Sequence, residues 1–165
     1  MEYVVIILNY MFKLLISDID GVLTTGCKTY DLNGNVISKE FNDKDFTAIK
    51  RFKERGVEVC FLSADDRVNK KIAESRKIPF YSVRDLKVKD KVELLEHLKK
   101  TYNVDNSEIV YVGDDLPDFK IITKLKYTFC PNDSSQIIKN AVRVILDRPG
   151  GAGVIAELYD NIYNE

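Results

Sequence analysis

The chain has 165 residues, of which 45% are hydrophobic and 31% are charged. That length is typical of one ordinary domain, and that balance is typical of a globular rather than a disordered protein. The 25 basic and 26 acidic side chains leave a net charge of −1, which gives no support for nucleic acid or an anionic membrane as a partner. We therefore expect residues 1–165 to form a single domain.

The first apolar run, residues 4–8, is far shorter than a membrane span, and no basic segment precedes it as in a signal peptide. Asn9-Tyr10 interrupts this run before a second one begins at Phe12. Met11 is an alternative start, which would make residues 1–10 a dispensable extension.

From Met11 onward, apolar runs typical of strands alternate with segments of helical spacing. The predicted strands are Lys13–Ile16, Val57–Leu62, Pro79–Ser82, Ile109–Val112, Tyr127–Cys130 and Val142–Leu146. Helical spacing is found around residues 46–52 and 92–98, and over 116–124, 134–140 and 154–163. This alternation indicates βαβ units, so we predict an α/β fold: a Rossmann-like three-layer sandwich with a mainly parallel sheet.

One insertion interrupts this alternation after the first strand. Two extended segments, Cys27–Leu32 and Val36–Glu40, flank Asn33-Gly34, a strong short-range signal for a β-hairpin. A two-stranded hairpin is marginally stable alone in water and needs a packing partner. A neighbouring subunit and the hairpin's own domain are both open as that partner.

The residues at the carboxyl ends of the predicted strands carry the chemistry, since ligands of open parallel sheets bind there. They are Asp18, Asp20, Ser63, Asp65, Lys91, Asp114, Asp115 and Asp118. Carboxylates packed closely repel one another unless a cation intervenes, and oxygen ligands with room for water favour Mg²⁺ over Zn²⁺. The sequence therefore predicts a Mg²⁺ site at which an ammonium and a hydroxyl hold phosphate oxygens.

Other metal and nucleophile chemistries receive little support from the composition. Cys27, Cys60 and Cys130 are odd in number and widely spaced, which argues against a disulfide framework and a structural zinc site and favours a cytoplasmic location. The one histidine, His97, lies within a helical pattern away from the strand ends. We expect it to be structural or exposed rather than catalytic.

Four segments at these strand ends resemble motifs I to IV of the haloacid dehalogenase superfamily, in order and at suitable spacing. They are Asp18-Ile19-Asp20-Gly21-Val22-Leu23-Thr24, Ser63, Lys91 and Gly113-Asp114-Asp115-Leu116-Pro117-Asp118. The resemblance covers nearly the whole chain from Met11. It implies a phosphatase in which Asp18 attacks phosphorus and forms an aspartyl phosphate.

The same resemblance implies roles for the other motif residues. Asp20 would protonate the leaving oxygen and then deprotonate the attacking water. Ser63 and Lys91 would hold the phosphoryl group. The Mg²⁺ ligands would be Asp18, Asp114 and the backbone carbonyl of Asp20. Asp115 and Asp118 would hold these ligands and Lys91 in position without touching the metal.

No cap domain fits this sequence, because only a hairpin follows motif I and one helix with one short strand lies between Ser63 and Lys91. The chain is thus similar to the capless branch, and in particular to the 3-deoxy-D-manno-octulosonate 8-phosphate phosphatases and the nonulosonate 9-phosphate phosphatases. Further support comes from Phe41-Asn42-x-x-Asp45 and Gly150-Gly151-Ala152-Gly153. The resemblance implies a phosphorylated keto sugar acid as substrate, a role in sugar-acid and lipopolysaccharide biosynthesis, and a homotetramer in which the hairpins assemble.

Contacts to the substrate are implied for Asn42, Lys44, Asp45 and Asp65. The chain departs from the octulosonate enzymes here, since Ser63-Ala64-Asp65 replaces Thr-Gly-Arg. Nonulosonate-type relatives can carry an acid at that position, which shifts the expected substrate toward them. Lys44 stands where the family often has Arg, so a bidentate contact would become a point charge.

Several readings stay open at this point. Gly113-Asp114-Asp115 alone would also suit a turn into a capped helix, and Lys91 competes with Lys89 for the phosphate. Gly150–Gly153 is read as a flexible lead into the next helix, or as a segment that closes a neighbour's site. Two other functions also remain: a phospho-accepting receiver domain, and an idle phosphatase-like domain partnering a sugar-nucleotide synthetase. Receivers place the acid pair first, whereas here Asp-x-Asp comes first.

Overall fold

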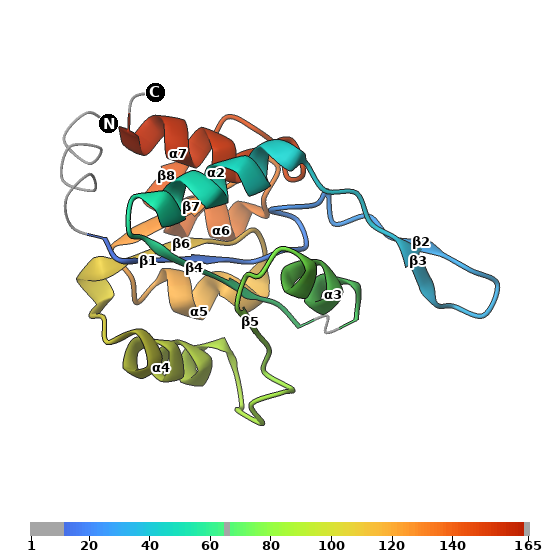
Figure 1. Cartoon of the computed structure of the whole chain (residues 1–165), viewed down its shortest axis with the longest axis horizontal. Coiled ribbons are helices and arrows are strands. Elements are labelled where there is room, and N and C mark those ends of the chain that lie inside the picture. The colour runs from blue at the N-terminus through green and yellow to red at the C-terminus, as the bar shows by residue number, and fades with distance from the viewer. Residues whose placement is uncertain (1–11, 65–66, 164–165) are drawn as a thin grey trace.

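A computed structural model describes residues 12–64 and 67–163 and contains a six-stranded parallel sheet (Figure 1). The strand order is β5-β4-β1-β6-β7-β8. The strands are β1 (Leu14–Ser17), β4 (Glu58–Leu62), β5 (Phe80–Tyr81), β6 (Ile109–Val112), β7 (Tyr127–Cys130) and β8 (Val144–Ile145). All six lie within or close to the runs predicted from the sequence, and the parallel α/β fold is confirmed.

The central strand is β1, which pairs in parallel with β4 on one side and β6 on the other. Its residues Leu14, Leu15 and Ile16 are fully buried. A strand covered on both faces by helices needs apolar side chains pointing both ways, which explains the continuous apolar run. This arrangement brings the carboxyl ends of β1, β4 and β6 together at one edge.

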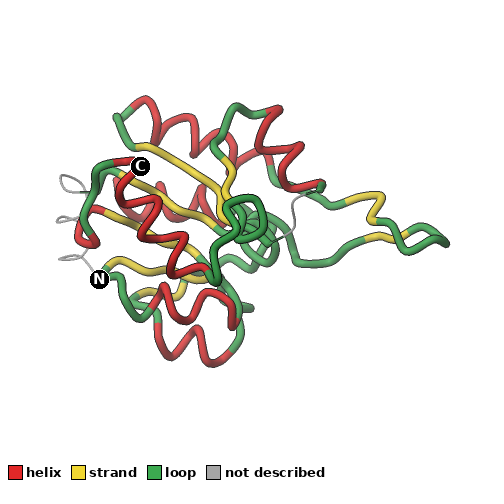
Figure 2. Tube along the Cα trace, turned by 90° about the horizontal axis from the view of Figure 1, so that it is seen from below, coloured by secondary structure: helices red, strands yellow, loops and turns green. Residues whose placement is uncertain are grey.

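Helices cover the two faces of the sheet, as Figure 2 shows from below. On one face α2 (Asp43–Glu54) packs beside α7 (Val154–Tyr163). On the other face lie α4 (Lys91–Tyr102), α5 (Phe119–Ile122) and α6 (Gln136–Ala141), and α3 (Val68–Ser75) lies near the β4–β5 edge. The buried side chains accordingly form two clusters, one on each face, with Phe52 and Leu158 in the first and Leu94 and Leu98 in the second.

One helix predicted as continuous is divided in the structure. The segment 116–124 is a 3₁₀ turn (Leu116–Asp118) followed by the short α5, rather than one continuous helix. Pro117 lacks a backbone N–H, and Asp115 and Asp118 exchange side-chain and backbone hydrogen bonds across the turn. These local bonds fix a tight turn at the end of β6 instead of a regular first turn of helix.

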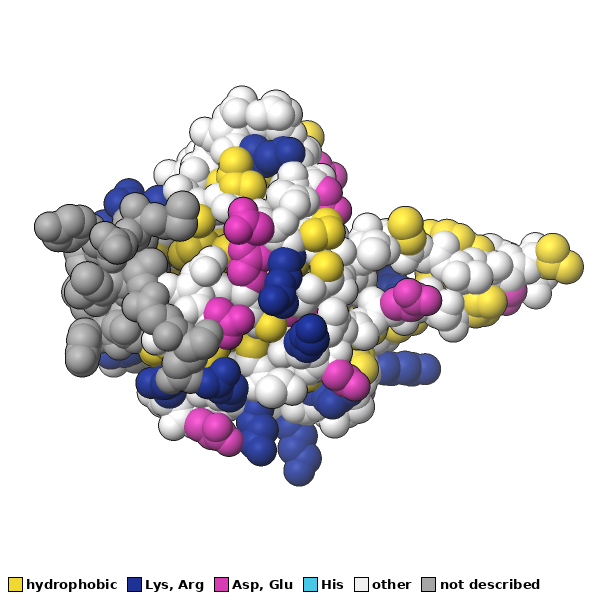
Figure 3. All heavy atoms as spheres, turned by 90° about the horizontal axis from the view of Figure 1, so that it is seen from above, with side chains coloured by type: hydrophobic (Ala, Val, Ile, Leu, Met, Phe, Trp, Pro, Cys, Tyr) yellow, Lys and Arg dark blue, Asp and Glu magenta, His cyan; other side chains and the backbone are white. Residues whose placement is uncertain are grey.

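The predicted hairpin is present and consists of β2 (Thr29–Tyr30) and β3 (Val36–Ser38). It extends away from the body of the molecule in both ribbon views instead of lying along its own domain (Figures 1 and 2). Its apolar side chains Tyr30, Leu32 and Ile37 are exposed, and apolar groups are visible along the projection in Figure 3. The expectation that the hairpin packs on its own domain is therefore wrong for most of the length of the hairpin.

No cap domain covers the sheet edge in the described ranges, since only the hairpin follows β1 and only α3 and β5 lie between β4 and α4. Among the helices that the structure describes, none is both long and apolar enough to cross a membrane. The proposed extension, residues 1–10, lies outside the described residues.

Candidate active site

Asp18 follows β1 directly and lies at the carboxyl edge of the sheet. Its backbone N–H donates to Val112 O on β6 at 2.9 Å, which continues the parallel pairing one residue beyond the strand. Its Oδ1 accepts a hydrogen bond from the N–H of Ile19 at 2.6 Å. With 8% of its surface exposed, this carboxylate is fixed by the backbone while Oδ2 remains available for other partners.

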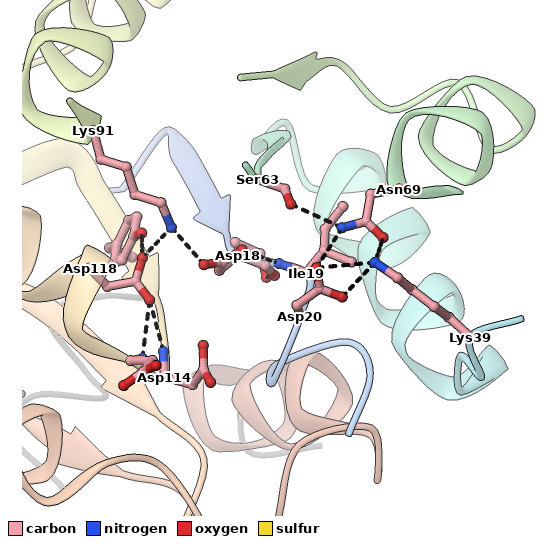
Figure 4. Close-up of polar contacts among 12 residues, drawn as sticks. Asp18, Ile19, Asp20, Lys39, Ser63, Asn69, Lys91, Asp114 and Asp118 are labelled. Carbon is pink, nitrogen blue, oxygen red and sulfur yellow. Dashed lines mark hydrogen bonds and ion pairs between the residues drawn. The ribbon is translucent and has the colours of Figure 1, made fainter. Parts of the chain in front are cut away.

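Lys91 is the cation that meets Asp18. It is the first residue of α4, whose N-cap Asp90 accepts from the backbone N–H groups of Val92 and Glu93. The Lys91 Nζ lies 2.6 Å from Asp18 Oδ2 and 2.6 Å from Asp118 Oδ1 (Figure 4). The alternative, Lys89, has a side chain that is 88% exposed and pairs with Glu93. The structure thus brings Lys91, and not Lys89, beside Asp18.

Asp118 organises this side of the site from a fully buried position. Its Oδ1 accepts from the Tyr111 hydroxyl at 2.5 Å as well as from Lys91. Its Oδ2 accepts from the backbone N–H groups of Asp114 and Asp115 at 3.0 and 3.3 Å. One carboxylate thereby holds both the ammonium and the loop after β6. Sequence reasoning missed Tyr111, because a tyrosine inside an apolar strand gives no sign that its hydroxyl faces the site.

Asp114 is placed by the close approach of two loops. A Cβ on Gly21 would lie 1.9 Å from Asp114 Oδ2, and Gly21 has φ of +81°. Only a glycine satisfies both requirements, since a side chain would displace the carboxylate and strain the backbone. Carboxylate oxygens of Asp18, Asp114 and Asp118 lie within 4.8 Å of one another. Each oxygen of Asp118 already accepts two hydrogen bonds, whereas each oxygen of Asp18 accepts one. Asp18 and Asp114 are therefore the pair best suited to hold a cation.

The electrostatics of this cluster fit a divalent cation. Burial raises the pKa of Asp18 to about 7, with Lys91 opposing the rise and Asp118 adding to it. Burial, together with the charges of Asp18 and Asp118, raises the pKa of Asp114 to about 8. The pKa of Lys91 is raised above its usual range, because the two carboxylates outweigh the opposing effect of burial. A cation with oxygen preference would relieve the repulsion that raises these carboxyl pKa values.

Asp20 and Ser63 lie on the other side of Asp18 (Figure 4). Asp20 is half-buried, and its carboxylate accepts from Lys39 and Asn69. The Ser63 hydroxyl is buried after β4 and accepts from Asn69 Nδ2 at 2.9 Å. Sequence reasoning missed Lys39 and Asn69, since one is a hairpin lysine and the other a helix asparagine with no distinctive spacing from the motifs.

These groups face a cleft of about 600 Å³. Its acidic floor contains Asp18, Asp20, Asp114, Asp115 and Asp118. Ser63 and Lys91 also line the cleft. Three further cations, Lys28, Arg67 and Arg84, line the same cleft. It therefore combines an acidic floor suited to a cation with basic groups suited to an anionic substrate.

A model of the haloacid dehalogenase-like hydrolase family matches residues 86–158. The 3-deoxy-D-manno-octulosonate 8-phosphate phosphatase of Haemophilus influenzae is 32% identical over 152 residues, which cover 91% of this chain and 82% of the relative. The chain belongs to the haloacid dehalogenase superfamily. It is a phosphatase of that superfamily, as the Haemophilus influenzae relative is.

Solved structures of this superfamily agree in fold. The cobalt-bound form of the deoxy-D-mannose-octulosonate 8-phosphate phosphatase from Haemophilus influenzae is 30% identical, with a TM-score of 0.85 and coverage of 96% of this chain and 90% of that chain. A protein described as a subfamily III A hydrolase of the superfamily, from Legionella pneumophila, is also 30% identical, with a TM-score of 0.88 and coverage of 99% and 88%.

Three of the four expected substrate contacts of this phosphatase do not line the cleft. Asn42 is the N-cap of α2, where its side chain accepts from the N–H of Lys44. Lys44 lies in a separate groove between α2 and α7. Asp45 is 1% exposed and accepts from the backbone N–H groups of Ile155 and Ala156 at the start of α7. The fourth, Asp65, lies outside the described residues.

The glycine-rich segment of the phosphatase packs on the loop that follows Asp18. The Gly151 N–H donates to Val22 O at 2.9 Å, and a Cβ on Gly150 would lie 2.2 Å from Gly21 O. The segment therefore packs closely against this loop and supports it. The interpretation of the segment as a flexible lead into α7 did not include this contact. His97 is exposed on α4, as expected.

Proposed function

We propose that this phosphatase is a Mg²⁺-dependent phosphomonoesterase that passes through an aspartyl phosphate on Asp18. The observation that carries this proposal is the placement of Asp18 Oδ2 within 2.6 Å of the Lys91 ammonium, at the end of the central strand and facing the cleft. In the first step an Asp18 oxygen forms a bond to phosphorus while the bond from phosphorus to the substrate oxygen breaks. In the second step water attacks phosphorus, the bond to Asp18 breaks and inorganic phosphate leaves.

We assign the proton transfers of both steps to Asp20. Its carboxyl group gives a proton to the leaving oxygen in the first step and its carboxylate takes one from the attacking water in the second. The position of Asp20 in the cleft, two residues from Asp18, supports this role. Ser63 and Lys91 are suited to hold the remaining phosphoryl oxygens, because both line the same cleft.

The cation would be held by Asp18, Asp114 and the backbone carbonyl of Asp20, with Asp115 and Asp118 supporting the loop. When bound, it would neutralise the carboxylates and polarise the phosphoryl group. The raised pKa values of Asp18 and Asp114 support this assignment. The oxygen-only donor set and open cleft favour Mg²⁺.

The substrate we propose is a phosphorylated keto sugar acid, either 3-deoxy-octulosonate 8-phosphate or a nonulosonate 9-phosphate. Support comes from the named activity of the Haemophilus influenzae relative and from the basic groups Lys28, Arg67 and Arg84 around the acidic floor. These cations suit a second anionic group, such as a carboxylate, on a substrate whose phosphate lies at Asp18.

The decisive test compares the wild type with Asp18→Asn, using phosphate release from eight- and nine-carbon keto acid phosphates and from hexose phosphates. We expect kcat/KM to be highest for the keto acids and turnover by the variant to fall by at least about 10³-fold, since an amide is a poor nucleophile. Chelation should abolish activity and Mg²⁺ should restore it. Retained turnover in Asp18→Asn, or indifference to chelation, would contradict the proposal. A phosphorylated protein stable for minutes would instead indicate a receiver.

A further inference from the structure

The base of the hairpin reaches into the active site through one buried lysine. Lys39 follows β3 directly, and its side chain is 0% exposed. Its Nζ lies 2.8 Å from Asp20 Oδ1, 3.1 Å from Asp20 Oδ2 and 2.8 Å from Asn69 Oδ1. A buried ammonium is costly unless it is paired, so this geometry ties the end of the hairpin to the carboxylate of Asp20.

Asn69 completes the arrangement from the first turn of α3. It is fully buried, and its Nδ2 donates to Asp20 Oδ2 at 3.0 Å and to Ser63 Oγ at 2.9 Å. Its Oδ1 accepts from Lys39. The orientation of the amide is fixed by these partners, because a carboxylate can only accept and an ammonium can only donate. One side chain thus joins the Asp20 carboxylate to the Ser63 hydroxyl.

We propose that Lys39 and Asn69 are positioning residues that hold the Asp20 carboxyl group where it meets the leaving oxygen of the substrate. The inference rests on the role of Asp20 in the proposed function. Three elements converge on this one group: the loop after β1, the base of the hairpin and α3 (Figure 4). The Asp20 side chain is 27% exposed toward the cleft and also lies 3.7 Å from Lys28 Nζ. That ion pair is longer and restrains it less, so loss of the Lys39 and Asn69 contacts would let the side chain adopt other rotamers.

The chemistry of this step gives the inference a specific signature. As phosphorus moves to an Asp18 oxygen, the proton of the Asp20 carboxyl group passes to the leaving oxygen. An alkoxide is a poor leaving group and needs that proton, whereas p-nitrophenolate leaves without it. Positioned proton transfer is worth about 10²- to 10⁴-fold in rate. Loss of the positioning contacts should therefore slow alkyl phosphates much more than p-nitrophenyl phosphate.

The test compares kcat/KM on a primary alkyl phosphate and on p-nitrophenyl phosphate, because kcat/KM reports transfer of phosphorus to Asp18 and excludes the later hydrolysis step that both substrates share. The variants are Lys39→Met, which keeps a long unbranched side chain, and Asn69→Leu, which keeps the approximate volume. We expect each variant to lose roughly 10- to 100-fold on the alkyl substrate, part of the general-acid effect, and less than about 3-fold on p-nitrophenyl phosphate. Lys39→Arg should restore part of the alkyl activity. Lys50→Met, on the exposed face of α2, is the matched control and should change neither rate.

Equal losses on the two substrates in folded variants, or no loss, would overturn the inference. If Lys39→Met fails to fold, as judged by circular dichroism, Asn69→Leu and Lys39→Arg decide the question by the same ratio. Failure of the proposed function would look different: the wild type would release no phosphate, or Asp18→Asn would remain active. If wild-type turnover depends on Asp18 but the variants leave the ratio of the two rates unchanged, the inference is wrong and the proposed function still stands.

Discussion

At the scale of single residues, the site is built around carboxyl groups that burial makes costly to ionise. Asp18 and Asp114 have pKa values raised to about 7 and about 8, and their neighbour Asp118 is itself buried. Ionisation of these carboxyl groups is unfavourable in the folded protein unless a cation is bound. The stability of the metal-free protein should therefore report on these two residues.

We predict that the metal-free protein loses stability as pH rises from about 4 to about 8. In the folded state Asp18 and Asp114 hold protons that the unfolded chain has released above its pKa near 3.8. The folded state thus binds more protons across this window, so stability is greatest at the acid end and is lost as pH passes through the folded pKa values. Urea denaturation at several pH values in the presence of a chelator measures this slope, which is the change in the free energy of unfolding with pH.

Asp114→Asn should flatten the slope, and added Mg²⁺ should raise stability most at the alkaline end in the wild type. A stability that rises with pH across the same window in the chelated wild type would show that these carboxyl groups are not the buried, repelling pair described above.

Gly21 offers a second prediction at this scale. Gly21→Ala should weaken metal-dependent activity by at least about 10-fold, because its Cβ would lie 1.9 Å from Asp114 Oδ2 and misplaced groups cost rate steeply. The measurement is activity as a function of Mg²⁺ concentration. Gly56→Ala is the matched control, since Gly56 has the same φ of +81° with nothing within 4 Å of its Cβ. An unchanged Mg²⁺ requirement in Gly21→Ala would contradict the assignment of Asp114.

At the scale of elements, α2 and α7 are joined by more than apolar packing. Asp45 on α2 accepts two backbone hydrogen bonds from the first turn of α7 through a single oxygen. The other oxygen, Oδ2, is buried without a partner, and burial raises the pKa of this carboxyl to about 6. The contact is a helix cap supplied by a residue 110 positions away in the sequence.

We predict that Asp45→Ala lowers the free energy of unfolding by about 1–2 kcal/mol, the cost of a lost cap. Asp45→Asn keeps an oxygen acceptor and should retain most of the stability. Denaturation measures this, and KM measured alongside separates the cap from the substrate contact implied by the sequence. Unchanged stability with a raised KM in Asp45→Ala would favour the substrate contact instead.

The elements themselves were largely predictable from the sequence, and the reason lies in their burial. Strands such as β6 are fully buried, so their apolar runs stand out, and the motif residues follow them directly. The contacts around Asp20 were not predictable, because Lys39 and Asn69 lie 19 and 49 positions away from it. No local pattern links residues that meet only after the hairpin and α3 have packed against the loop.

At the scale of the whole molecule, the projecting hairpin sets the expected assembly. Tyr30, Leu32 and Ile37 are 56%, 107% and 62% exposed on an element that has few contacts with the body. Exposed apolar groups on a marginally stable hairpin favour burial against other copies. We propose a homotetramer in which the hairpins assemble.

We predict that Ile37→Asp shifts the protein from a tetramer toward monomers, as measured by light scattering after size-exclusion chromatography. A buried charge at this contact would be costly. Ile137→Asp is the matched control, since Ile137 is 43% exposed on α6, and it should leave the mass unchanged. A monomeric wild type, or a tetrameric Ile37→Asp variant, would contradict the assembly proposed here.

The packing of Gly150 and Gly151 on the loop after Asp18 has a consequence for biosynthesis. Asp18, the proposed nucleophile, emerges from the ribosome early, whereas the backbone that supports its loop is translated much later. Partially synthesised chains would therefore carry all four motifs and still lack a finished catalytic loop. Competence for turnover would arise late in translation, when α7 docks against α2 and draws the glycine segment into place.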